Sequence, residues 1–125
     1  MKRNMDLCRL ILFKIEEEYV STALYNLKIT GYSDEEVAYH CKLLFDNELI
    51  SDYKDGYVDD SLDYFGVGSL TWKGHDFIDK IREDTVWNRT KEVMKEKMLP
   101  TTIEVIKDIS GAIIKSMIES AIKTI

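Results

Sequence analysis

The segment spanning residues 33–50 constrains the fold of this chain most strongly, because it predicts a capped helix that leads directly into a strand. Ser33 is a preferred N-cap residue, and Glu36 three positions later completes a capping box. Asn47 lies where the helix should end, and Asn adopts the left-handed conformation of a C-terminal cap more readily than most residues do. Leu49 then begins an extended segment. The rest of the chain must pack around this helix-to-strand unit.

Helical spacing divides the side chains of this central helix into two faces. The face expected to pack contains Val37, Cys41, Leu44 and Phe45. The face expected to be exposed contains Glu35, Tyr39, Lys42 and Asp46. The exposed face is therefore where a partner would meet this helix.

Length and composition predict one soluble cytoplasmic domain. The chain has 125 residues, of which 45% are apolar and 32% charged, and this is typical of a globular protein with a modest core. No apolar run is long enough to span a membrane, and the first residues lack the apolar block of a signal peptide. Cys8 and Cys41 lie on apolar helical faces, so we expect buried thiols in a reducing compartment.

The negative charge of the chain is concentrated around the central helix. The whole chain carries a net charge of −6, yet residues 32–65 alone contain ten acidic residues and two lysines, a local net charge of −8. A DNA-binding surface needs Lys and Arg where it meets phosphate. The charge distribution therefore disfavours DNA and favours a basic partner.

The segments on either side of the central helix complete a small mixed domain. A helix is predicted from Asn4 to Glu18, with Asn4 as a candidate cap. An alternating pattern over 22–30 predicts a strand. We see no second short helix before the central one, as a standard helix-turn-helix would have. Two further strands are expected over 49–53 and 64–71, with a turn at Asp55-Gly56.

A second informative pattern, Leu70-Thr71-Trp72-Lys73-Gly74, predicts the end of a strand and the start of a helix, with Thr71 as a cap. That helix should continue to about Met98 with a break at Asp84, and Pro100 ends it. Trp72 and Trp87 are expected to pack the sheet against helices, with a base-stacking surface built with Tyr39 and Phe77 as the alternative.

The last segment, 101–125, is predicted to be a helix that is too apolar to bury its whole surface in its own domain. We therefore expect it to serve as a dimerisation element, with residues 1–98 forming the main domain and 99–125 the C-terminal helix. Burial within its own fold is the alternative, and its polar side is not basic enough to favour a membrane surface. The expected dimer face contains Ile106, Ile113, Ile114, Met117, Ile118 and Ala121.

These patterns resemble known folds. The central helix followed by Leu-Ile and a strand resembles the recognition helix and wing entry of winged-helix domains, and Leu-Thr-x-x-Gly resembles the wing exit of MarR-like and PadR-like regulators. Three stretches resemble the bacterial and prophage-encoded family called domain of unknown function 2513: MKRNMDLCRLIL, VAYHCKLLFDNELI and SLTWKGHDFIDKIREDTVWNRTKE. The resemblance implies a winged-helix-like fold and a bacterial or phage origin. Together with the patterns above, we predict an α+β, mostly helical fold with a small antiparallel sheet and additional C-terminal helices. The resemblance implies no activity and no site residues.

The sequence contains no recognisable catalytic or metal-binding motif. His40 and His75 are the only histidines, and Cys41 points about 100° away from its neighbour His40 around the helix. There is no phosphate-binding glycine loop and no nucleophile motif. We therefore predict a protein that is not an enzyme and has no cofactor, and we expect structural roles for both histidines.

Two functions follow from these patterns. The first is a protein-interaction module in which the acidic helix and wing dock a basic partner. The alternative is a regulator-like DNA binder, and an enzyme of unrecognised type is a third hypothesis. The residues expected to contact a partner or DNA are Lys2, Arg3, Tyr39, Lys42 and Lys54.

Overall fold

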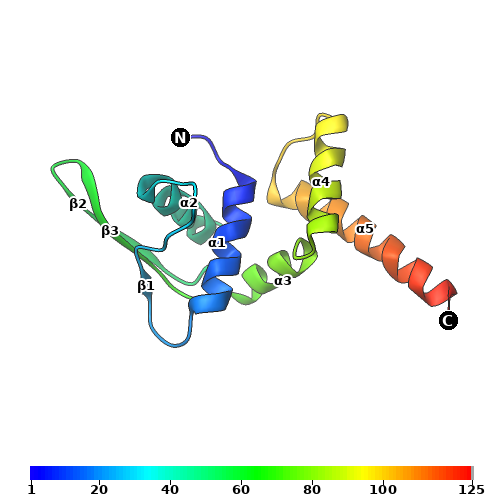
Figure 1. Ribbon diagram of the computed structural model, residues 1–125, viewed down its shortest axis with the longest axis horizontal. Helices are drawn as coiled ribbons and strands as arrows, with labels where there is room; N and C mark the ends of the chain where they lie inside the picture. Colours follow the sequence, from blue (N-terminus) through cyan, green and yellow to red (C-terminus); the bar gives the residue numbers. More distant parts are fainter. Residues whose placement is uncertain (125) are drawn as a thin grey trace. The chain divides into compact units, whose positions relative to one another are not determined.

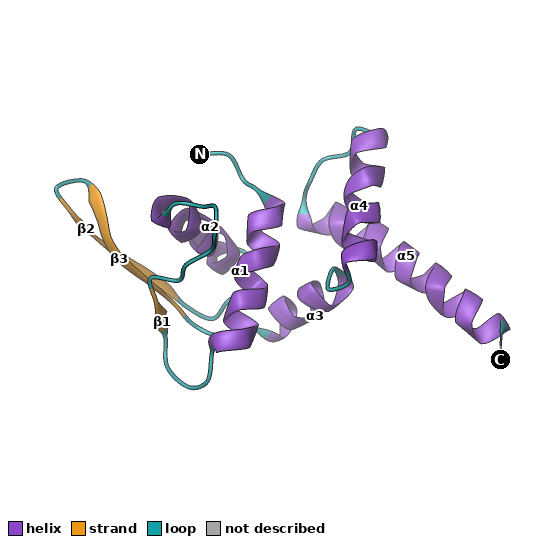
Figure 2. Cartoon of the chain, in the orientation of Figure 1, coloured by secondary structure: helices purple, strands orange, loops and turns teal. Residues whose placement is uncertain are grey.

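The computed structural model describes residues 1–124, which form five helices and three strands (Figures 1 and 2). In chain order these are α1 (Met5–Glu18), β1 (Leu24–Tyr25), α2 (Asp34–Asp46), β2 (Tyr53–Val58), β3 (Ser61–Val67), α3 (Trp72–Lys80), α4 (Asp84–Glu96) and α5 (Ile103–Lys123). The strands form one antiparallel sheet in the order β1-β3-β2. The predicted α+β, mostly helical class with a small antiparallel sheet is confirmed.

The chain divides into two compact units, Met1–Asp76 (unit 1) and Phe77–Ile125 (unit 2). This boundary falls inside α3, whereas the sequence placed a boundary near residue 98. The boundary near residue 98 was predicted because the C-terminal helix was expected to be a dimerisation element, and that role stays a prediction.

Helix α1 begins where the sequence predicted. The Asn4 side chain accepts a hydrogen bond from the Leu7 backbone N–H at 3.2 Å, which satisfies one of the free donors of the first turn. The apolar stripe of the helix is fully buried at Leu7, Ile11 and Ile15. Capping and periodicity together therefore place this helix correctly.

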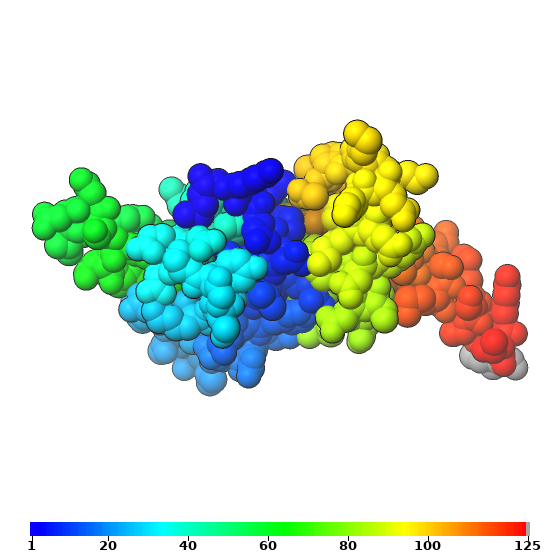
Figure 3. Space-filling model, turned by 45° about the horizontal axis from the view of Figure 1, so that its top comes forward, coloured from blue at the N-terminus to red at the C-terminus, as the bar shows by residue number. Residues whose placement is uncertain are grey.

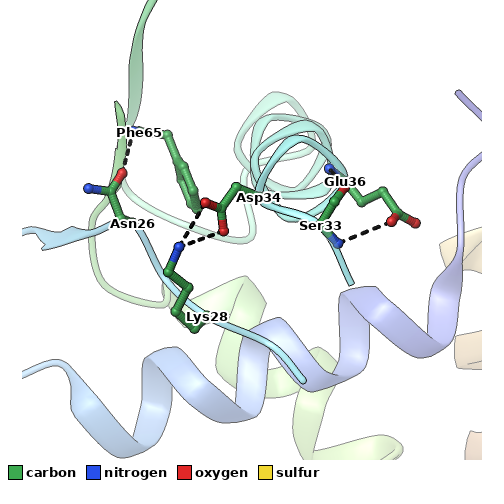
Figure 4. Close-up of polar contacts among 6 residues, drawn as sticks. All are labelled: Asn26, Lys28, Ser33, Asp34, Glu36 and Phe65. Carbon is green, nitrogen blue, oxygen red and sulfur yellow. Dashed lines mark hydrogen bonds and ion pairs between the residues drawn. The ribbon is translucent and has the colours of Figure 1, made fainter. Parts of the chain in front are cut away.

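The predicted strand over residues 22–30 is mostly wrong, because only Leu24–Tyr25 pairs with β3. Asn26 adopts a positive φ of 53°, which turns the chain out of the sheet. Its side chain accepts a hydrogen bond from the Phe65 N–H, and farther along Lys28 binds both carboxylate oxygens of Asp34 at 2.7 Å (Figure 4). Within residues 1–124, no helix lies between α1 and α2, as predicted.

Helix α2 begins with the predicted capping box, in which Ser33 and Glu36 bond each other's backbone N–H (Figure 4). Its end differs from the prediction by one residue. Asn47 has φ −99°, and the left-handed residue is Glu48, with φ 63°. The Glu48 N–H bonds the Phe45 carbonyl, and the Leu49 N–H bonds the Leu44 carbonyl at 2.9 Å. This is a Schellman motif with Glu where Gly is usual.

The strands β2 and β3 form a hairpin whose tip extends from the body of unit 1 (Figure 3, green). The predicted turn at Asp55-Gly56 is wrong, because both residues lie in β2. The turn is instead at Asp59 and Asp60, which have φ values of 49° and 64°. Two consecutive positive φ values match the twist of a hairpin, and Asp tolerates them better than most residues.

Unit 2 is built on the packing of α4 with α5. Its buried side chains include Trp87 and Met94 of α4 and Ile106 of α5. The predicted dimer face is therefore wrong at Ile106, which is fully buried within the chain and offers no surface to a second copy. The end of α5 is different, since Met117, Ile118 and Ile122 are 51%, 53% and 64% exposed.

Candidate functional site

Two hydrogen bonds from Thr71 join the start of α3 to the segment that follows α2 in unit 1, and a third caps α3. The Thr71 hydroxyl donates a hydrogen bond to the Glu48 carbonyl at 2.6 Å and accepts one from the Gly74 N–H at 3.0 Å. The Thr71 N–H donates to the Leu49 carbonyl at 3.0 Å. A Cβ at Gly74 would lie 2.1 Å from the Leu49 carbonyl oxygen, so only Gly permits this approach. The Leu-Thr-x-x-Gly pattern is thus the joint between the two helices.

A surface groove lies at this joint, with a volume of about 710 Å³. We call it the Trp72 groove, and its lining residues are Phe45, Asp46, Glu48, Ile50, Ser51, Thr71, Trp72 and Lys73. Trp72 is 84% exposed and Phe45 is 38% exposed, so two aromatic side chains face solvent at one site. Exposed Trp is rare on soluble proteins and is enriched at the centre of protein interfaces.

This exposure overturns two predictions from the sequence. Phe45 was placed on the packed face of α2, and Trp72 was expected to pack the sheet against helices. Trp87 does pack, at 2% exposed, and so does Phe77 at 2%. Because Trp87 and Phe77 are buried, they cannot form the alternative base-stacking surface with Trp72 and Tyr39.

The groove lies at the negative end of the α2 dipole. The last turn of α2 contains no basic residue, and Asp46 and Glu48 add two carboxylates there. Within residues 1–124, neither of these side chains makes an ion pair or a hydrogen bond. A helix C-terminus is stabilised by cations, so this end of α2 favours a basic group. Lys73 also lines the groove, but within residues 1–124 it makes no ion pair with Asp46 or Glu48.

A second groove in unit 1, of about 440 Å³, lies between α1 and the loop after β1. Its lining includes Leu10, Phe13, Lys14 and Lys28. Lys14 pairs with Glu18 at 3.1 Å, and Lys28 pairs with Asp34 as described above. Because these charges are already satisfied, this groove is the weaker candidate for a docking site.

The five residues predicted to contact a partner lie on three separate elements. Lys2 and Arg3 are exposed ahead of α1, and Tyr39 and Lys42 are exposed on α2. Lys54 lies on β2 with its ammonium 5.0 Å from the centre of the Tyr25 ring. Hydrogen bonding to Tyr25 raises the pKa of Lys54. None of the five lines the Trp72 groove.

The two histidines have different surroundings. His40 is 1% exposed, and its Nε2 accepts a hydrogen bond from the Asn4 N–H at 2.8 Å while its Nδ1 donates one to the Glu36 carbonyl at 2.7 Å. The Nε2 bond joins α2 to the start of α1, and the Nδ1 bond holds the ring on its own helix, which together are a structural role. His75 is exposed, and its Nδ1 lies 3.8 Å from a carboxylate oxygen of Glu16.

Both cysteines are free and buried. Burial raises the pKa of the Cys8 thiol to about 12, against a smaller opposing effect of the Arg3 charge. Burial also raises the pKa of Cys41 to about 12, and nearby Cys8 adds to this effect. Neither thiol has the lowered pKa that activates a nucleophile.

The described residues contain no cluster of metal-ligating side chains. Among residues 1–124, no group of three His, Cys, Asp or Glu side chains is placed to hold a metal ion. In the same residues, no helix combines the length and the apolar character needed to cross a membrane.

The exposure of Trp72 follows from helical periodicity once the structure shows that Gly74 packs against Leu49. A helix turns 100° per residue, so Trp72 lies about 160° around α3 from Gly74, the residue that faces Leu49. The residue on the far side of a close-packed glycine should be exposed. The Trp72 groove itself could not be predicted, because it requires residues from two helices and the segment between them.

Comparisons with known proteins agree with the resemblance seen in the sequence. A family model described as "Hypothetical protein (DUF2513)" matches residues 2–100. A protein of Haemophilus influenzae Rd, described as "Uncharacterized protein", is 38% identical over 126 residues, covering 94% of this chain and 99% of the relative. No solved structure matches this chain.

Proposed function

The chain belongs to the DUF2513 family, and from this premise we propose that it is a winged-helix-like, non-enzymatic protein that docks a basic partner protein in the Trp72 groove. The observation that carries the proposal is the exposed Trp72 beside the negative end of α2, where Asp46 and Glu48 make no ion pair within residues 1–124. We expect the protein to be of bacterial or prophage origin and to act in the cytoplasm.

The order of elements in unit 1 supports the winged-helix-like description. A helix, a short strand, a second helix and a hairpin follow one another, and β1 pairs with the second strand of the hairpin. In this description α2 takes the position of a recognition helix, and β2 and β3 form the wing. The missing helix between α1 and α2 makes the domain a reduced version.

The proposed partner segment combines an apolar anchor with Lys or Arg. The anchor would cover Trp72 and Phe45, and the basic group would meet Asp46 and Glu48. Aromatic anchors supply most of the energy of such interfaces, and complementary charge supplies orientation and specificity.

The backbone at Glu48 gives independent support. A left-handed φ costs a residue other than Gly about 1 kcal/mol, and this strain lies directly at the rim of the groove. Residues with a strained backbone conformation are found more often at functional sites than elsewhere. We infer that the Glu48 carboxylate is retained for binding at the expense of stability.

A selection from a displayed random peptide library tests the proposal. Peptides selected on the full-length protein should be enriched in Lys or Arg next to aliphatic or aromatic residues. Binding of a selected peptide, measured by fluorescence anisotropy, should weaken by roughly 30-fold in Trp72→Ala and roughly tenfold in Asp46→Lys. Glu96→Lys, the same charge change at an exposed residue of unit 2, is the matched control and should bind normally.

Intrinsic fluorescence gives a second readout of the same event. Because Trp72 is exposed and Trp87 is buried, acrylamide should quench mainly Trp72, and a bound peptide should reduce this quenching. In Trp72→Phe the peptide should have no effect on quenching. Peptides that bind Trp72→Ala as tightly as the natural sequence would refute the proposal.

The DNA-binding alternative has support from the exposed Tyr39 and Lys42 on α2. A random-sequence duplex titrated at several low salt concentrations distinguishes it. Affinity that falls steeply with salt would indicate phosphate contacts and favour the regulator-like function. The acidic α2 and wing lead us to expect no such binding.

A further inference from the structure

The second half of α5 carries an apolar stripe that unit 2 leaves exposed. Ile114, Ile118 and Ile122 follow one another at intervals of four residues, so they form a single ridge along the helix. Ile118 is 53% and Ile122 is 64% exposed, and Ile114 is partly buried. Figure 1 shows this half of α5 (orange to red) continuing past α4.

This ridge continues the row of α5 residues that packs within unit 2, because Ile106 and Ser110 lie at the same four-residue spacing. Ile106 and Ser110 are the buried residues of the helix. At 100° per residue, Ile118 lies about 120° around the helix from Ile106 and about 80° from Ser110. A row of residues four apart turns by about 40° around the helix at each step. Its second half therefore points away from the side chains that cover Ile106 and Ser110, and Ile118 and Ile122 remain exposed.

We propose that the ridge of Ile114, Ile118 and Ile122 binds the same ridge of a second copy of this chain, with the two α5 helices antiparallel and Ile118 on the twofold axis. In this register Ile114 of each copy lies opposite Ile122 of the other. Ridges spaced by four residues pack into each other at a crossing angle of about −50°, which is the commonest geometry of helix pairs.

Charge complementarity selects the antiparallel direction. Lys115 and Glu119 lie on one flank of the ridge, at about 60° and 100° from Ile118. The twofold axis of an antiparallel pair brings the same flank of both helices together. Lys115 of one copy and Glu119 of the other are then offset by only about 3 Å along the axis.

A parallel pair loses these contacts. It places the flank with Lys115 and Glu119 against the opposite flank of the second copy, which carries Met117 and Ala121. Two reciprocal ion pairs therefore form only in the antiparallel arrangement. The opposed helix dipoles favour the same direction.

Sedimentation equilibrium of the full-length protein across micromolar concentrations tests the self-association. The natural sequence should be a dimer, and Ile118→Glu should weaken the association by at least roughly 30-fold, because it buries two like charges on the axis. Ser116→Glu is the matched control, since it introduces the same charge about 160° around the helix and should leave the dimer intact. Circular dichroism of each variant verifies that α5 remains helical.

Charge exchange tests the register. Lys115→Glu and Glu119→Lys should each weaken the homodimer, whereas an equimolar mixture of the two variants should form a heterodimer tighter than either homodimer. The double variant should dimerise like the natural sequence. A full-length monomer at all concentrations, or a dimer unaffected by Ile118→Glu, overturns the interface. Mixed variants that show no preference for each other overturn the antiparallel register.

Discussion

Helices α2 and α5 are both amphipathic, yet they use their apolar residues in opposite ways. The apolar face of α2 is covered from Val37 to Leu44, and both ends of the helix are closed by capping motifs. α5 buries Ile106 near its start and leaves Ile118 and Ile122 exposed. An apolar stripe on a helix therefore predicts an interface, but the stripe does not show whether that interface lies within the chain or between chains.

The largest effect on stability is expected in the first half of α5, and substitutions in its second half should have a much smaller effect. Ile106→Ala removes a fully buried side chain and should reduce the free energy of unfolding by roughly 2–5 kcal/mol. Ile118→Ala, at a half-exposed position, should cost less than about 1 kcal/mol in the monomer. Urea denaturation at low protein concentration measures both. Equal losses in the free energy of unfolding would mean that the Ile118 side chain packs within its own chain.

The next effect should come from the joint that presents Trp72. Gly74→Ala places a methyl group against the Leu49 carbonyl and should destabilise the protein by roughly 1–3 kcal/mol. Gly111→Ala in α5 is the matched control, because its nearest neighbour would be Lys80 Nζ at 3.8 Å. That variant should instead stabilise α5 by about 0.5–1 kcal/mol through helix propensity. Thermal or urea unfolding that shows the same sign for both glycines would contradict this view of the joint.

A smaller loss of stability should appear at high pH, because the thiols of Cys8 on α1 and Cys41 on α2 are buried. The folded pKa of about 12 exceeds the ordinary value of 9.0, so Cys8 and Cys41 stabilise the fold fully below pH 9. As the pH rises from 9 towards 12, the unfolded chain loses these protons first, and stability falls. The loss at pH 10 should be about 1 kcal/mol per thiol.

Urea denaturation at a series of alkaline pH values measures this loss, with Cys8→Ala/Cys41→Ala as the reference for other groups that titrate there. The reference variant should show a shallower decline of stability with pH. Parallel declines would show that the thiols do not differ between the folded and unfolded states.

The smallest effect compares the ends of α2 and α4, which share the same termination. In α4, Met98 has φ 53°, and the Leu99 N–H bonds the Met94 carbonyl at 2.9 Å. Glu48→Gly and Met98→Gly should each increase the free energy of unfolding by up to about 1 kcal/mol by relieving the left-handed strain. Only Glu48→Gly should weaken binding of a basic peptide. Loss of binding in both variants would remove the assigned role of the Glu48 carboxylate.

Local signals account for what the sequence predicted well. The capping box at Ser33 and Glu36, the cap at Asn4 and the cap at Thr71 were each found where predicted, because each involves residues three positions apart. The hairpin turn and the strand over residues 22–30 were misplaced, because pairing with β3 decides which residues join the sheet. Asp-Gly is a common turn sequence, but here Asp55 and Gly56 pair with residues of β3 and therefore lie within a strand.

The sequence by itself determined the family, the α+β class, the helices and the concentration of acidic residues around α2. These depend on composition and on spacings of three or four residues, which are local. Only the tertiary structure decided that Trp72 faces solvent, that Glu48 is the left-handed residue and that Ile106 is buried while Ile118 is exposed. Burial depends on which segments, distant in sequence, pack over a side chain. The spacing of residues along the sequence does not show which segments these are.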